Sequence, residues 1–72
     1  MDEKKLSPMR VRRFLCGLSL DALAYQTKID QARLSRIERG WKMPTDRERR
    51  KIARALRVEV SEIFPEASDG RS

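Results

Sequence analysis

Residues 19–40 read SLDALAYQTKIDQARLSRIERG, and this stretch decides the fold because it carries two helix-start signals separated by a short interval. Ser19 and Asp30 are favoured N-cap residues, since their side-chain oxygens can accept a hydrogen bond from the first helical N–H groups. Each follows an apolar residue that can pack on a leucine early in the helix, which is a hydrophobic staple. The stretch ends in a glycine, a frequent helix terminator. It therefore predicts helices over 20–27 and 31–39, joined by a three-residue turn.

Helix-start signals on both sides of this stretch predict three further helices. Ser7 followed by Pro8 is an N-cap with proline at the first helical position, where the missing N–H is not needed. Thr45 and Glu48 have the spacing of a capping box, in which each side chain bonds the backbone N–H of the other residue. The first of these predicted helices covers 8–16, and the second begins at 45. The third covers 60–64 and is ended by Pro65.

The predicted organisation is that of one small all-α domain. A chain of 72 residues has the size of a single domain, and no alternating strand pattern or internal repeat is visible. The expected parts are an N-terminal arm over 1–6, a helical domain over 7–64 and a disordered tail over 65–72.

Positive charge is concentrated in the predicted helical part of the chain. The formal net charge is +6, but residues 4–57 hold 16 basic and 5 acidic residues, a local charge of +11. Such a field attracts polyanions. Arginines outnumber lysines, and the guanidinium fork suits phosphates and guanine edges better than an ammonium does. A solvated surface that keeps the protein soluble is the other interpretation of this charge.

The 31–39 helix has two faces of different character. One apolar stripe at helical spacing is predicted to face the core and comprises Leu34, Ile37 and Trp41. The opposite side carries Ala32, Arg36 and Arg39. Small residues with arginines let a helix enter the major groove of DNA, although the same composition also suits a merely solvated face. The preceding short helix and three-residue turn, the spacing of a helix-turn-helix, favour DNA binding.

Three motifs stand at a specific distance from one another: GLSLDALA at 17–24, LSRIERG at 34–40 and KMPT at 42–45. With these motifs the chain resembles the Xre and phage repressor-and-Cro family of helix-turn-helix proteins, over about residues 9–64. The resemblance implies a compact five-helix bundle, a lambda-repressor-like DNA-binding domain in which the 31–39 helix is the recognition helix.

The resemblance also implies roles for individual residues. The family's base-reading positions correspond here to Gln31, Ala32, Arg33 and Arg36. The expected phosphate contacts are Ser35, Arg39, Lys42, Thr45 and Arg47. The family further implies a structural ion pair between Arg13 and Glu38, which would lock the first helix to the recognition helix. Breaking such a pair costs more than forming it gains.

Four positions depart from the family pattern. Lys28 and Arg57 stand where glycine is frequent, and position 28 is one where a left-handed backbone can be needed. Leu20 replaces a glutamine that contacts phosphate in some members, so that contact is expected to be absent. Ala32 replaces a polar residue that contacts a base in other members, and alanine can offer only an apolar contact, for example to a thymine methyl group.

The 8–16 helix carries apolar residues on more than one side. Met9 and Cys16 share the face of Arg13, whereas the other sides carry Val11, Phe14 and Leu15. Either the 60–64 helix covers this second set with Ile63 and Phe64, or the set is a surface for a partner. We expect covering by the 60–64 helix.

Composition excludes several kinds of site. The chain has no histidine and one cysteine, which removes Cys/His metal sites and the usual Ser–His or Cys–His catalytic pairs. No enzyme activity, metal or cofactor is therefore expected, and Cys16 is expected to be a small core residue. No apolar run is long enough to span a membrane, so we expect a cytoplasmic protein.

The expected function is that of a sequence-specific regulator of transcription that binds double-stranded DNA and represses. It would bind its operator as a homodimer, with residues 57–64 as the expected contact between subunits. The alternative is an antitoxin-like protein-binding module that also binds DNA and contacts its partner through Val11, Phe14 and Leu15. An RNA-binding or non-specific nucleoid protein would keep the charge without reading bases.

Overall fold

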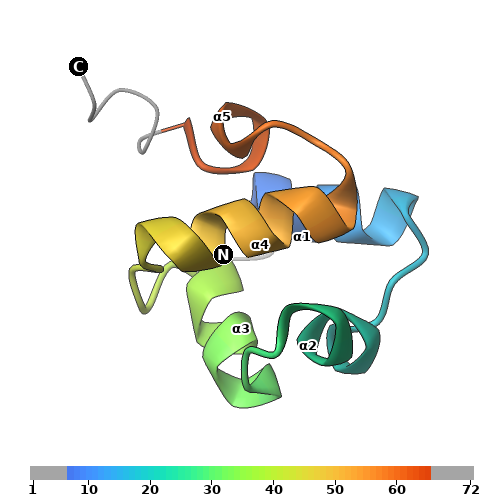
Figure 1. Cartoon of the computed structure of the whole chain (residues 1–72), viewed down its shortest axis with the longest axis vertical. Helices are drawn as coiled ribbons and strands as arrows, with labels where there is room; N and C mark the ends of the chain where they lie inside the picture. Colours follow the sequence, from blue (N-terminus) through green and yellow to red (C-terminus); the bar gives the residue numbers. More distant parts are fainter. Residues whose placement is uncertain (1–6, 66–72) are drawn as a thin grey trace, which may run out of the picture.

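The computed structural model describes residues 7–65 of the chain, and this part is built from helices (Figure 1). The helices are α1 (Pro8–Leu15), α2 (Leu20–Thr27), α3 (Gln31–Glu38), α4 (Asp46–Leu56) and α5 (Val60–Ile63). The predicted all-α fold of five helices is thereby confirmed. The predicted arm over 1–6 and nearly all of the predicted tail lie outside the described residues.

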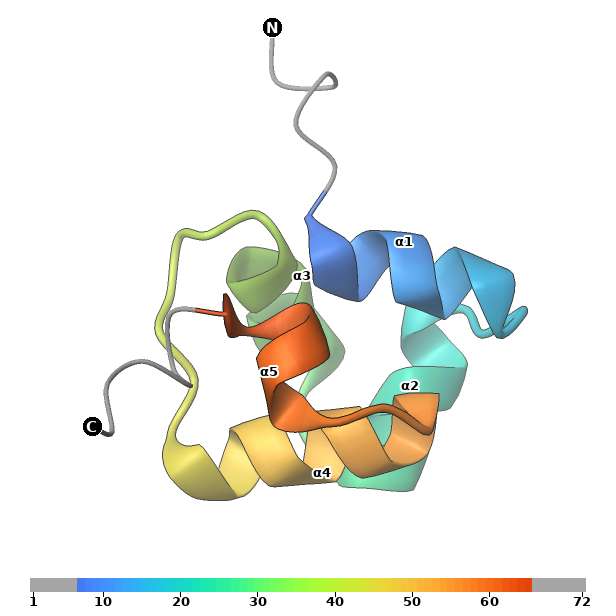
Figure 2. The same ribbon diagram turned by 90° about the horizontal axis from the view of Figure 1, so that it is seen from above.

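The longest helix, α4, lies along one edge of the bundle, and α1 lies along the opposite edge (Figure 2). Helices α2 and α3 lie on one side of α4 and α5 on the other, as the two views agree (Figures 1 and 2). Helix α2 packs against α3 and α4, while α5 packs against α1 and α4. Every helix contributes at least one buried apolar side chain to a common core: Met9, Leu23, Leu34, Ile37, Ile52, Ala53, Leu56 and Ile63.

The first four helices begin at the caps that the sequence predicts. The side-chain oxygens of Ser7, Ser19, Asp30 and Thr45 each accept a backbone N–H bond from the first turn, at 3.0–3.1 Å. These bonds satisfy N–H groups that have no partner within the helix. Helices α1 and α3 end one residue earlier than predicted, because Cys16 and Arg39 are their C-caps.

Two helices end in a left-handed residue that is not glycine. Lys28 closes α2 with φ of 63°, and Arg57 closes α4 with φ of 62°. Side chains with a Cβ are strained in this region of backbone space. Both residues stand where the family pattern favours glycine, so the expectation of a left-handed backbone at Lys28 is confirmed and extends to Arg57.

The predicted place of Trp41 in the core is wrong. Its side chain is 67% exposed, whereas Leu34 and Ile37 are buried as expected. The helical period does not reach Trp41, because α3 ends at Glu38 and Gly40 turns the backbone with φ of 82°. Trp41 instead lies against the guanidinium of Arg39, whose Cζ is 5.1 Å from the ring centre.

The expected covering of α1 by the last helix is also wrong in large part. Ile63 is buried in the common core, but Phe14 and Leu15 remain 54% and 72% exposed. The physical reason is length, since α5 has a single turn and reaches only one side of α1. The second apolar side of α1 therefore stays on the surface of the described part of the chain.

Candidate nucleic-acid interface

The turn between α2 and α3 is fixed by one threonine. Thr27 is buried, its hydroxyl donates to the carbonyl oxygen of Leu23 at 2.8 Å, and the hydroxyl oxygen accepts the N–H of Ile29 at 3.3 Å. Lys28 supplies the left-handed residue between them. Ile29 is buried, so the chain enters α3 from a fixed point in the core.

Helix α3 has an inner face in the core and an outward face open to solvent. Leu34 and Ile37 are buried on the inner side. We call the exposed set the outward face of α3; it comprises Gln31, Ala32 and Arg36. These three residues occupy one side of a helix whose other side is locked into the bundle, so the structure brings three of the four predicted base readers together.

The inner face of α3 also carries a buried ion pair. Arg13 of α1 and Glu38 of α3 form a two-bond pair, with Nε to Oε2 at 2.8 Å and Nη2 to Oε1 at 3.3 Å. Their side chains are 9% and 5% exposed. Arg13 Nη1 also donates to the carbonyl oxygen of Leu18 at 3.0 Å. The pair that the resemblance implied is therefore present, and it ties α3 to α1 and to the loop before α2.

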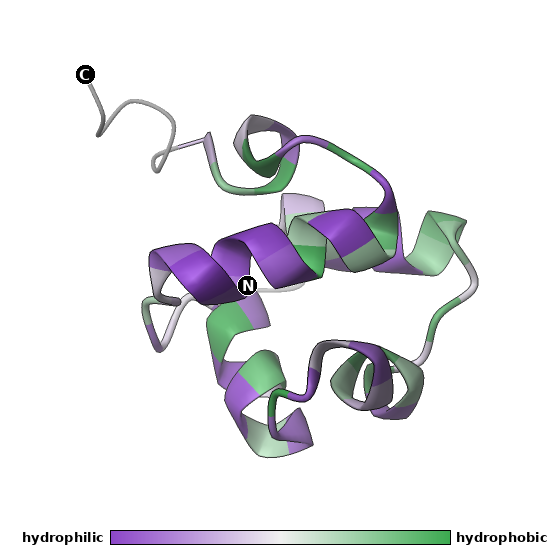
Figure 3. Ribbon diagram, in the orientation of Figure 1, coloured by the Kyte–Doolittle hydropathy of each residue, from purple (hydrophilic) through white to green (hydrophobic). Residues whose placement is uncertain are grey.

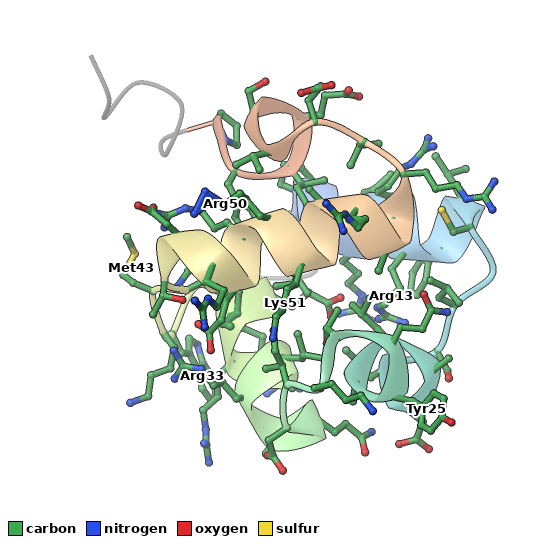
Figure 4. The ribbon with its side chains drawn as sticks, in the orientation of Figure 1. Arg13, Tyr25, Arg33, Met43, Arg50 and Lys51 are labelled. Carbon is green, nitrogen blue, oxygen red and sulfur yellow. The ribbon has the colours of Figure 1, made fainter. Side chains whose placement is uncertain are left out.

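The fourth predicted base reader, Arg33, is held by a residue of α4. Its Nε donates to Glu48 Oε2 at 2.8 Å and its Nη2 donates to Oε1 at 2.9 Å. Figure 4 places Arg33 beside α3 and below the start of α4. The hydrogen bonds from Arg33 lower the pKa of Glu48 to about 2, and the N–H of Thr45 adds to this effect. The same hydrogen bonds raise the pKa of Arg33.

The role of Glu48 toward Arg33 was not anticipated from the sequence. The capping-box spacing assigns Glu48 to the start of α4, and Glu48 Oε1 does accept the Thr45 N–H at 2.9 Å. The second use of the same carboxylate joins residues that are 15 positions apart. The only sign of the pair in the sequence is that Glu48 and Arg33 carry opposite charges. Many oppositely charged residues on neighbouring helices form no ion pair, so this sign alone does not predict one.

Of the predicted phosphate contacts, Ser35 lies within α3 and Arg39 caps its end, whereas Lys42, Thr45 and Arg47 lie in the loop before α4 and at the start of α4. Arg39, Lys42, Thr45 and Arg47 are exposed, and Ser35 is half-buried. The loop is bonded to the end of α3, because the N–H groups of Trp41 and Lys42 both donate to the carbonyl oxygen of Arg36. Figure 3 shows hydrophilic residues along the N-terminal half of α4. The Thr45 N–H is already bonded to Glu48, which leaves the hydroxyl hydrogen as its remaining donor.

A further arginine shapes the start of α4 without having been predicted. Arg49 Nη1 donates to the carbonyl oxygen of Pro44 at 2.8 Å, and Nη2 pairs with the Asp46 carboxylate. Pro44 is buried, so the loop reaches α4 in a fixed position. Lys42, Thr45 and Arg47 therefore stand on a loop and helix start that are anchored to both α3 and the core.

Comparison with known proteins places the chain in a family. A family model described as "Helix-turn-helix" matches residues 9–63. The chain belongs to this family, the Xre and phage-repressor type of helix-turn-helix proteins, whose members are DNA-binding regulators. No match was found among curated proteins or among solved structures. Within residues 7–65, no helix is long and apolar enough to cross a membrane.

Proposed function

We propose that this protein is a sequence-specific regulator that binds double-stranded DNA in the cytoplasm, placing α3 in the major groove and repressing transcription. The observation that carries the proposal is the outward face of α3. Gln31 and Arg36 are exposed together, while Leu34, Ile37 and Glu38 hold the other side of the helix in the core. Gln31 can pair with adenine and Arg36 with guanine, while Ala32 can contact a thymine methyl group.

The proposal is tested by selecting binding sites from random duplexes at one fixed salt concentration. A fixed concentration matters because protein–DNA affinity depends steeply on salt. We expect one preferred sequence to emerge. Equal recovery of all duplexes would contradict sequence-specific binding and favour a non-specific nucleic-acid protein.

The variant Arg36→Ala tests which residue reads a base. We expect about a tenfold loss of discrimination at one base pair of the selected site, the size of one two-bond contact. Arg36→Lys is the matched control, because it keeps the charge but lacks the planar fork. If Arg36→Lys retains full discrimination, the planar fork is not needed for it, and if Arg36→Ala weakens binding to all duplexes equally, Arg36 does not read a base.

Lys42 is proposed to contact phosphate, together with Ser35, Arg39, Thr45 and Arg47. Lys42 is exposed on the anchored loop before α4. Lys42→Ala should weaken binding to every duplex about equally and lower the slope of log affinity against log salt by about one. A loss confined to one base pair would instead make Lys42 a base reader.

Binding as a homodimer is part of the same proposal. Two copies of α3 would meet half-sites about one helical turn of DNA apart. The expected contact lies in residues 57–64, which include the exposed Glu59 and Glu62. Sedimentation analysis on a palindromic duplex should give two protein chains for each duplex, and a single chain at saturating protein would contradict the dimer.

A protein-binding role is the second candidate, favoured by the surface of α1. Val11, Phe14 and Leu15 are exposed apolar residues, and a groove between α1 and α5 is lined in part by Val11, Leu15 and Val58. Figure 3 shows this hydrophobic end of α1 at an edge of the molecule. Phe14→Ser should abolish binding to a specific protein partner, such as the product of an adjacent gene, and leave duplex binding unchanged.

A further inference from the structure

The Arg33–Glu48 pair leaves one edge of the guanidinium open. A guanidinium has a side edge, formed by Nε and one terminal nitrogen, and a tip edge, formed by the two terminal nitrogens. Glu48 occupies the side edge through Nε and Nη2. Nη1 bonds no side chain or backbone group within residues 7–65 and is not among the enclosed unpaired nitrogens, so solvent reaches it.

Glu48 is itself held at a fixed place, which makes it a suitable support. Its Oε1 accepts the backbone N–H of Thr45, and its own N–H donates to Thr45 Oγ at 3.1 Å. The carboxylate is thus fixed to the first turn of α4. A long arginine side chain usually loses much rotamer freedom when it binds a ligand, and ordering it beforehand removes part of that cost.

We propose that Glu48 is a positioning residue that orders Arg33 so that the tip edge of its guanidinium meets two hydrogen-bond acceptors of the bound DNA. The acceptors are either the O6 and N7 atoms of a guanine or two oxygens of the phosphate backbone, both of which suit a planar fork. The proposal rests on the DNA-binding function proposed above and adds a residue of α4 to it.

Electrostatics require the pair to persist in the complex. If Arg33 left Glu48 to bind DNA with its side edge, the Glu48 carboxylate would face the phosphates uncompensated, beside the predicted phosphate contacts Thr45 and Arg47. Repulsion between the Glu48 carboxylate and the phosphates would oppose binding. Contact through the tip edge avoids this cost, because Glu48 keeps both of its bonds to Arg33.

The main test is the variant Glu48→Gln in the full chain. The glutamine oxygen still accepts the Thr45 N–H, but the side chain no longer provides two charged acceptors to Arg33. We expect binding to the selected duplex to weaken about fivefold to tenfold at fixed salt, the size of one well-placed contact. Binding that stays equal to wild type or becomes tighter would overturn the proposal.

A double-variant cycle shows whether Glu48 acts through Arg33. In the Arg33→Ala background, Glu48→Gln should no longer weaken binding and should tighten it slightly, because the side chain that Glu48 orders is gone and an uncompensated carboxylate is removed. An equal loss in both backgrounds would overturn the proposal. Glu48→Asp is a second variant, expected to weaken binding as Glu48→Gln does, since the shorter side chain keeps the charge but changes its position.

The variant Arg33→Ala distinguishes the two sources of acceptors. A guanine contact predicts loss of discrimination at one base pair, whereas a phosphate contact predicts uniform weakening and a salt slope lower by about one. Either result supports the proposal when it comes with the coupling to Glu48. Unchanged affinity of Arg33→Ala for every duplex would overturn it.

Two controls separate this proposal from loss of folding and from failure of the proposed function. Circular dichroism and thermal unfolding of Glu48→Gln should show the helix content of wild type and one cooperative transition, because glutamine at position 48 can still complete the capping box of α4. If the wild-type protein prefers no duplex, the proposed function fails. If wild type and the Arg36 variants behave as proposed but Glu48→Gln matches wild type, only the present proposal fails.

Discussion

Two arginine–glutamate pairs hold α3, one at each end, and they differ in how far water reaches them. The Arg13–Glu38 pair near the end of α3 is almost fully buried, whereas the side chains of Arg33 and Glu48 near its start are 35% and 19% exposed. Both pairs have the same two-bond geometry. The comparison teaches that two pairs with the same bonds can differ in exposure, so that only the Arg33–Glu48 pair is open to solvent.

The largest effect is expected from breaking the buried pair. Glu38→Ala leaves the Arg13 cation enclosed without its partner, and loss of one partner of a buried pair costs about 3–5 kcal/mol. Urea unfolding followed by circular dichroism measures the change. The double variant Arg13→Met with Glu38→Leu should recover most of the loss, because no charge is then buried. A loss below about 1 kcal/mol for Glu38→Ala would contradict the comparison.

A smaller effect on stability is expected at the exposed pair. Glu48→Ala removes the hydrogen bond from the Thr45 N–H to the Glu48 carboxylate but keeps the N-cap bond to the Thr45 hydroxyl, so the loss should be about 1 kcal/mol, the size of one hydrogen bond. The partly exposed ion pair itself should add little, because water and salt screen it. The same urea unfolding measures this variant. A loss as large as that of Glu38→Ala would show that exposure does not separate the two pairs.

Acid should remove the contribution of Glu48 in a defined pH window. Its pKa is lowered from 4.5 to about 2, mainly by the hydrogen bonds from Arg33, so the folded state favours the ionised form. The stabilisation is fully present above about pH 4.5 and is lost as pH falls toward 2. The stability difference between wild type and Glu48→Gln should therefore shrink across this window. A difference independent of pH would show that Glu48 is not held ionised in the folded protein.

The smallest effect is expected in the turn that precedes α3. Lys28→Gly relieves a left-handed conformation that costs about 1–2 kcal/mol, but glycine costs about 0.5–1 kcal/mol of backbone entropy. The net expected gain is about 0.5 kcal/mol. Arg57→Gly is the matched variant after α4 and should gain a similar amount. Thermal unfolding measures both, and a lower midpoint for Lys28→Gly would show that the lysine side chain stabilises the turn.

Helix starts were predictable because each depends on one residue and its near neighbours. Ser7, Ser19, Asp30 and Thr45 cap the helices as their residue types predict. The direction of the outward face of α3 followed from helical spacing within one element. Trp41 escaped the same reasoning because Gly40 ends the helical geometry before it. Local rules thus predicted the helices and failed at Trp41, three residues beyond the end of α3.

The Arg33–Glu48 pair was not predictable because it depends on how two helices are placed relative to one another. Glu48 has a sufficient local role at the cap of α4, and nothing local shows that its carboxylate also reaches α3. The exposure of Phe14 and Leu15 depends in the same way on the length of α5, a single turn.

Trp41 gives the protein a built-in optical probe beside α3. It is the only tryptophan of the chain, its indole is 67% exposed, and it lies under the Arg39 guanidinium. Its fluorescence in the free protein should be that of an indole in contact with water. If Arg39 moves onto a phosphate, the indole loses its cation and part of its hydration, so the intensity and wavelength of emission should change. Titration of unlabelled protein with duplex would then follow binding directly.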